Sequence, residues 1–196
     1  MASTRFARPA TQAPGAAETT QPDLLSTAPG RRALAALRIA VGFVFLWAFL
    51  DKTFGLRHST GAPREDGSVA SSWIDGGAPS QGYLQNGAVG PAKDLFASMA
   101  SPLTDWLFML GMLGVGLAVV LGIGLRVSAV AGSVLMMSLW LTQWPPRDGS
   151  MNPVVDQHLA YTLVLIVCAL LLAGDTWGLG RRWASLPLVR RAPVLR

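Results

Sequence analysis

Residues 106–144 run WLFMLGMLGVGLAVVLGIGLRVSAVAGSVLMMSLWLTQW, and Arg126 is the only charged residue among them. About 20 apolar residues are enough for a helix to cross the hydrocarbon core of a bilayer. This stretch is about twice that long, so it cannot be one helix across a single membrane. Gly122-Ile123-Gly124, next to Arg126, predicts a tight turn. We therefore expect two membrane-spanning helices, at about 103–121 and 127–144.

Two further segments are also mainly apolar and long enough to cross a membrane. The first runs from about Ala33 to Phe54, and the other starts near Asp156 and ends near Gly174. Pro153 precedes the latter segment, and Gly174-Asp175 is typical of a helix end. The sequence thus predicts an all-α integral membrane protein, a four-transmembrane-helix bundle. A long loop of about residues 55–102 joins its first two helices, and a short helix is expected after Gly90-Pro91.

The composition agrees with a membrane location. Charged residues make up 14% of the chain, against roughly 25% in soluble domains, and the mean hydropathy is +0.40. The net charge of +5 would also suit nucleic acid, but most arginines lie beside apolar runs, which favours a membrane surface and excludes nucleic acid as the partner. Cys168 is the only cysteine, and His58 and His158 are the only histidines. Neither an internal disulfide nor a bound metal is expected.

The distribution of basic residues predicts the orientation. Cytoplasmic loops of membrane proteins are enriched in Lys and Arg. Arginines precede the first span, occupy the short turn and follow the last span: Arg5, Arg8, Arg31, Arg32, Arg126, Arg181, Arg182, Arg190, Arg191 and Arg196. We expect a multi-pass plasma-membrane protein with both termini in the cytoplasm. Its predicted parts are a disordered tail (1–30), the membrane domain (31–185) and a basic tail (186–196).

Small residues recur at Gly114, Ala118 and Gly122 in the second span. Such spacing lets two helix backbones approach closely. Packing within the bundle is the first interpretation, and a homo-oligomer seam is the alternative.

Ionisable residues inside membrane helices need partners or a polar cavity. Arg38 lies in the cytoplasmic half of the first span, where it either extends to the interface or faces the bundle on the same side as Phe45 and Lys52. Asp51 and Lys52 lie near the outer end, as an interfacial pair or as site residues.

A second polar group begins the fourth span. Asp156 suits the positive end of the helix, and His158 shares a helix face with Tyr161. Either His158 only helps to start the helix, or it serves a site at the outer end of the bundle.

Several motifs, in their order and spacing, together resemble the DoxX/DoxD family of small membrane proteins over about residues 30–185. They are Leu37-Arg38-Ile39 with Asp51-Lys52, Trp73-Ile74-Asp75-Gly76-Gly77, Gly90-Pro91, Trp106-Leu107-Phe108-Met109-Leu110-Gly111, Gly122-Ile123-Gly124-Leu125-Arg126, and Asn152-Pro153 with Asp156 and His158. The chain looks most similar to the DoxD type, the membrane subunit of thiosulfate:quinone oxidoreductase. That resemblance implies thiosulfate and a membrane quinone as substrates and a second redox subunit, DoxA, as partner. The sequence has no haem, flavin or phosphate-loop signature, so no tightly bound cofactor is expected.

We assign site residues on this basis. The dianionic thiosulfate requires cations, which Lys52, Arg147 and His158 supply. The quinone head requires hydrogen-bonding and proton-relaying groups, for which His158, Tyr161 and Asp156 are suited. The catalytic candidates are His158, Asp156, Lys52 and Asp51, and the substrate-binding candidates are Arg147, Arg38, Tyr161, Trp73 and Asn152. The alternatives are a non-catalytic subunit that docks a soluble oxidoreductase on the basic tail, and a small transporter with a polar path from Arg38 to Lys52.

Overall fold

A computed structural model of the chain describes residues 19–63 and 67–196, and within these ranges it contains helices and no β-strand. The long helices are α2 (Ala28–Phe54), α5 (Pro102–Leu121), α6 (Leu125–Gln143) and α7 (Gln157–Leu170). The short ones are α1 (Gln21–Leu24), η1 (Trp73–Asp75), α3 (Pro79–Asn86), α4 (Lys93–Ser98), η2 (Ala173–Asp175), α8 (Gly180–Ala184), α9 (Pro187–Arg191) and η3 (Pro193–Leu195).

The helices α2, α5 and α6 are each long and apolar enough to cross a membrane. They match the predicted spans closely, and the Gly122–Gly124 turn joins α5 to α6 as expected, since both glycines adopt left-handed conformations. The fourth segment differs from the prediction. Its helix α7 has 14 residues, so it rises only about 21 Å. It ends before Leu172, whose φ is +48°, and the chain continues into η2.

Close backbone contact between α2 and α5 comes from two glycines. A Cβ on Gly42 would lie 2.8 Å from the amide nitrogen of Val120, and one on Gly116 would lie 2.7 Å from that of Leu46. A side chain at either position would force the helices apart. The predicted stripe is not this contact. A Cβ at Gly114 would meet nothing within 4 Å, whereas one at Gly122 would lie 2.7 Å from the Cα atom of Gly174, so of these two glycines only Gly122 packs closely within the bundle.

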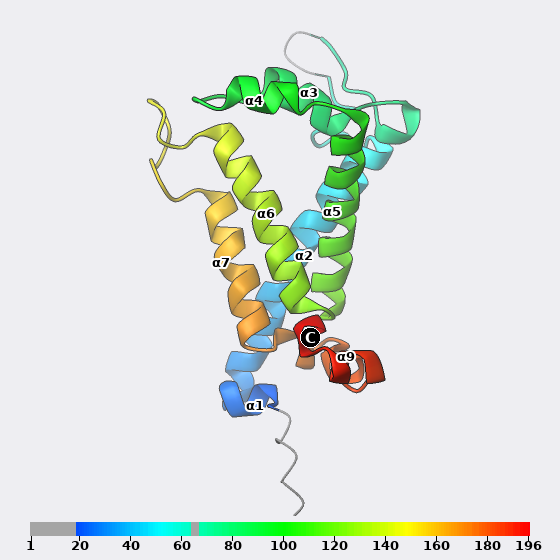
Figure 1. Ribbon diagram of the computed structural model, residues 1–196, viewed down its shortest axis with the longest axis vertical. Coiled ribbons are helices and arrows are strands. Elements are labelled where there is room, and N and C mark those ends of the chain that lie inside the picture. The colour runs from blue at the N-terminus through cyan, green and yellow to red at the C-terminus, as the bar shows by residue number, and fades with distance from the viewer. Residues whose placement is uncertain (1–18, 64–66) are drawn as a thin grey trace, which may run out of the picture.

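The four long helices converge at one end and spread apart at the other (Figure 1). The C-terminus lies toward the convergent end, together with α1 and α9 (Figure 1). The helices α3 and α4, from the long segment between α2 and α5, lie across the spread end (Figure 1). The expected short helix after Gly90-Pro91 is α4, and its apolar residues are only partly covered: Phe96 is buried, but Leu95 is 62% exposed.

The two predicted tails are partly folded. Residues 1–18 lie outside the described residues, but residues 19–30 include α1 and the start of α2. Gln21 is fully buried, and its Oε1 accepts a 2.6 Å hydrogen bond from the Thr176 hydroxyl. At the other terminus, the Arg126 amide donates to the Arg196 carbonyl at 3.1 Å. Residues 19–30 and 186–196 therefore both contact the rest of the described chain.

Candidate functional site

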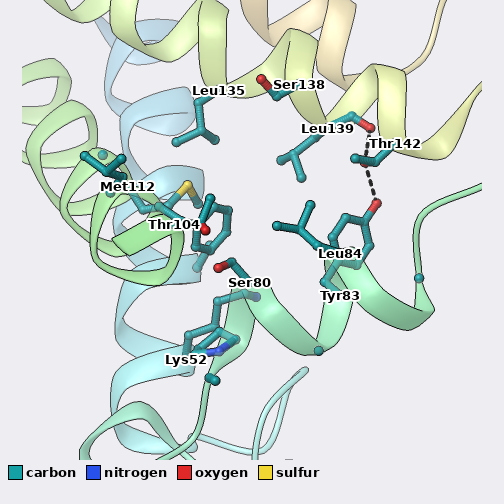
Figure 2. Close-up of a pocket in the computed structure, with 18 of the residues that line it drawn as sticks. Lys52, Ser80, Tyr83, Leu84, Thr104, Met112, Leu135, Ser138, Leu139 and Thr142 are labelled. Carbon is teal, nitrogen blue, oxygen red and sulfur yellow. Dashed lines mark hydrogen bonds between the residues drawn. The ribbon is translucent and has the colours of Figure 1, made fainter. Parts of the chain in front are cut away.

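A cavity of about 1330 Å³ lies at the spread end, between α2, α3, α5 and α6 (Figure 2). Small-molecule sites usually measure about 300–1,000 Å³, so this cavity has room for a large ligand. Its lining is mainly apolar. Figure 2 shows Leu84 of α3 directed toward Leu139 of α6, beside the point where Tyr83 of α3 meets Thr142 of α6.

Two polar contacts fix α3 over the cavity. At its start, the carboxylate of Asp105 on α5 accepts hydrogen bonds from the Ser80 amide at 2.7 Å and from the Ser80 hydroxyl at 2.6 Å. Farther along, the Tyr83 and Thr142 hydroxyls form a 2.9 Å hydrogen bond (Figure 2). The helix α3 is therefore attached to both α5 and α6, the two helices that border the cavity.

Lys52 enters the cavity wall from the last turn of α2. Its side chain is half-buried, and Nζ donates a 3.5 Å hydrogen bond to the Ser59 hydroxyl. The ammonium group of Lys52 places a positive charge in a mainly apolar wall. This charge favours the binding of a ligand with an anionic or strongly polar group.

The adjacent Asp51 has a different position. It is 1% exposed, and its carboxylate accepts four hydrogen bonds from residues 58–60: the amides of His58, Ser59 and Thr60 at 2.9–3.1 Å and the Ser59 hydroxyl at 2.6 Å. It is not among the described cavity-lining residues. Asp51 thus holds the loop that follows α2, and this loop in turn holds Lys52.

His158 also lines the cavity, and Asp156 orients it. The Asp156 Oδ2 atom lies 2.7 Å from Nδ1 of His158, while Oδ1 accepts hydrogen bonds from the amides of His158 and Leu159 at 2.9 and 3.1 Å. When the ring is neutral, a proton on Nδ1 leaves Nε2 as its acceptor. Such a carboxylate–imidazole pair is suited to take up and release protons.

Asp156 precedes α7 and caps it. Partial burial acts to raise the pKa of its carboxyl group, but the hydrogen bonds from the His158 ring and from the Leu159 and His158 amides outweigh that effect and hold the pKa below its ordinary value. Asp156 therefore stays ionised beside the His158 ring.

The structure places the other predicted site residues away from the cavity lining. Arg147 is exposed in the turn after α6, and Asn152 accepts backbone hydrogen bonds from Val154 and Val155 at 2.9 and 2.8 Å. Tyr161 packs against the apolar core. Trp73 stacks edge-on with Trp106, with ring centroids 4.6 Å apart.

Arg38 faces the protein, at the convergent end. It is fully buried, and its guanidinium donates to the carbonyl of Val119, to that of Val120 at 2.6 Å and to that of Trp177 at 3.0 Å. It thereby connects α2 to the end of α5 and to the turn after η2. Of the two alternatives for Arg38, the side chain therefore faces the protein rather than extending to the interface, and Arg38 and Lys52 lie in separate environments.

Sequence reasoning missed Ser80, Tyr83, Asp105 and Thr142. Asp105 could have been identified from the sequence as a residue with a polar partner, because a carboxylate in the first turn of a strongly apolar helix needs one. Tyr83 is one of only two tyrosines, but nothing in the sequence links it to Thr142, 59 residues away.

Within residues 19–63 and 67–196 no three His, Cys, Asp or Glu side chains gather into a group that could hold a metal ion. Comparisons with models of protein families, with curated proteins and with solved structures found no match to this chain.

Proposed function

We propose that this protein is a membrane redox protein of the DoxX/DoxD type, which passes electrons from thiosulfate or a related sulfur donor to a membrane quinone bound in the cavity. The observation that carries the proposal is the large, mainly apolar cavity whose lining includes both Lys52 and His158. An apolar pocket with a few polar groups is suited to an amphipathic ring compound.

The membrane arrangement is part of the proposal. The helices α2, α5 and α6 form three crossings, and α7 with η2 completes a fourth. The short loop at Arg126 and the arginines of α8 and α9 then face the cytoplasm, as do both termini. The cavity end, covered by α3 and α4, faces the opposite side of the membrane.

The residues of the cavity match the chemistry of this reaction. Two thiosulfate ions join through a new sulfur–sulfur bond to give tetrathionate and release two electrons, and the quinone takes up those electrons with two protons to become the quinol. His158, paired with Asp156, supplies and replaces protons at the quinone oxygen. Lys52 attracts the anionic donor and stabilises negative charge on the reduced ring.

Purified protein in lipid nanodiscs should reduce a soluble quinone analogue at the expense of thiosulfate. Lys52→Ala and His158→Gln are each expected to lower the rate at least tenfold. Lys93→Ala is the matched control, because Lys93 is the other lysine, is exposed on α4 and does not line the cavity. Full activity in Lys52→Ala, or no thiosulfate-dependent reduction by the wild-type protein with its co-purifying partners, would refute the proposal.

A docking subunit is the second candidate. Arg181 and Arg182 on α8 and Arg190 and Arg191 on α9 are exposed, and together they offer a positive surface to a soluble oxidoreductase. Recovery of a flavin or thiol enzyme from mild detergent, lost when these four arginines are changed to glutamate, would support it. An isolated chain that is active alone would reject it.

A transporter has less support. Phe45, midway between Arg38 and Lys52 on α2, is fully buried in the apolar core. The described residues along this side of α2 therefore do not form the polar path that transport would need.

A further inference from the structure

The cavity is open on one side, between α5 and α6. Leu107 on α5 and Val134 on α6 both line it, yet each is 63% exposed. Val134 follows Val130, 68% exposed, by one helical turn on the outer surface of α6. Side chains that line a closed cavity would be covered, so Leu107 and Val134 form the rim of a lateral opening.

The polarity of the lining changes along this opening. Near α3, Thr104 of α5 and Thr142 of α6 contribute hydroxyl groups. Farther from α3 the lining of both helices becomes apolar, with Met112 on α5 and Leu135 on α6 (Figure 2). The polar groups thus occupy one end of the cavity and the apolar groups extend toward the middle of the helices.

The helices on both sides of the opening are apolar enough to cross a membrane. In a bilayer, an opening between them faces hydrocarbon rather than water. A ligand that enters here comes from within the membrane, with its polar head directed to α3 and its apolar chain left between α5 and α6.

We propose that the opening between α5 and α6 is the entrance and chain-binding groove for the prenyl tail of a long-chain quinone. This inference rests on the proposed function and adds to it the lateral route by which the quinone enters from the bilayer and the groove that holds its tail.

Binding is tested separately from catalysis, with a quinone that carries a photoreactive group on its prenyl tail, in nanodiscs containing the full chain. Labelling is expected within residues 107–112 and 131–135, and excess unlabelled long-chain quinone should compete for it. Bilayer phospholipid is in large excess in this experiment, so groove labelling at low probe concentration indicates preference for the quinone. Labelling spread evenly over lipid-facing residues of all helices would overturn the inference.

Blocking the rim gives a second readout. Val134→Trp is expected to reduce groove labelling at least fivefold, and Val130→Trp, its neighbour outside the cavity lining, should change it less than twofold. Leu107→Trp blocks the opposite rim, and it replaces Val134→Trp in the labelling experiment if Val134→Trp fails to fold. Equal labelling of rim variants and Val130→Trp would refute the groove.

The two proposals fail in different ways. If the tail labels the groove but thiosulfate does not reduce the bound quinone, the redox function fails and the groove stands. If a tail-free soluble quinone is reduced but the groove remains unlabelled, the redox function stands and the lateral entrance fails.

Discussion

Replacement of Arg38 by leucine is expected to destabilise the bundle severely. The guanidinium is fully buried and donates to the carbonyls of Val119, Val120 and Trp177, with a longer 3.5 Å contact to that of Thr176. These carbonyls lie at the end of α5 and in the turn after η2. Leucine fills part of the space but leaves the carbonyls without this donor.

The size of the effect follows from the number of bonds. Hydrogen bonds between membrane helices contribute on average about 0.6 kcal/mol and up to about 1.7 kcal/mol each. Three bonds, without the longer contact to Thr176, therefore predict that Arg38→Leu lowers the free energy of unfolding by about 2–5 kcal/mol. The free energy of unfolding of Arg38→Lys should lie between those of the wild-type protein and of Arg38→Leu, because a single ammonium group cannot reach carbonyls on two sides as a planar guanidinium does.

The free energy of unfolding is measured in mixed micelles by titration with a denaturing detergent, with helix content as the signal. Arg32→Leu is the control, because Arg32 lies on the same helix but is exposed, and its effect should stay within about 0.5 kcal/mol. A change of less than 0.5 kcal/mol in Arg38→Leu would show that the carbonyls do not depend on Arg38.

Three further outcomes are expected. Asp51→Ala removes the acceptor of four hydrogen bonds from residues 58–60, so amide hydrogen exchange there should accelerate at least tenfold; unchanged protection contradicts this. Tyr83→Phe removes one hydrogen bond to Thr142, worth about 1 kcal/mol, and a cysteine placed at Leu84 should then react faster with a maleimide; an equal rate means that the bond does not hold α3. The lowered pKa of Asp156 stabilises the fold above the ordinary aspartate value of about 3.9, and this contribution disappears as the pH falls through the lower folded-state pKa. Asp156→Asn should lack that acid-dependent loss in unfolding titrations, and parallel curves for the two proteins would contradict the role of this carboxylate.

The long helices could be predicted because hydrophobicity and turn residues coincide. Arg126 is the one charge between Trp106 and Trp144, and Gly122 and Gly124 adopt the positive φ values that a tight turn there requires. Lys52 and His158 could be expected to share a site because each lies at the same predicted end of its span. Both do line one cavity.

Other features depend on contacts between distant parts of the chain. Nothing in the sequence marks the end of α7 near Leu172, because leucine rarely adopts the positive φ that it has there. The partners of Arg38 lie 81 to 139 residues away. Gln21 lies in a polar segment typical of disorder, but its contact with Thr176 makes it part of the fold.

The ionisable residues of the bundle fall into two groups that hydropathy alone cannot separate. Arg38 and Asp51 are fully or almost fully buried, and the hydrogen bonds that they form are mainly to backbone partners. Ligand binding to either would first have to break those bonds in a poorly hydrated environment, at a cost of several kcal/mol. Lys52 and His158 instead border open volume, so a ligand can approach them without disrupting the fold. A ligand can therefore reach ionisable side chains at the spread end of the bundle, while the buried Arg38 connects α2 to α5 and to the turn after η2 at the opposite end.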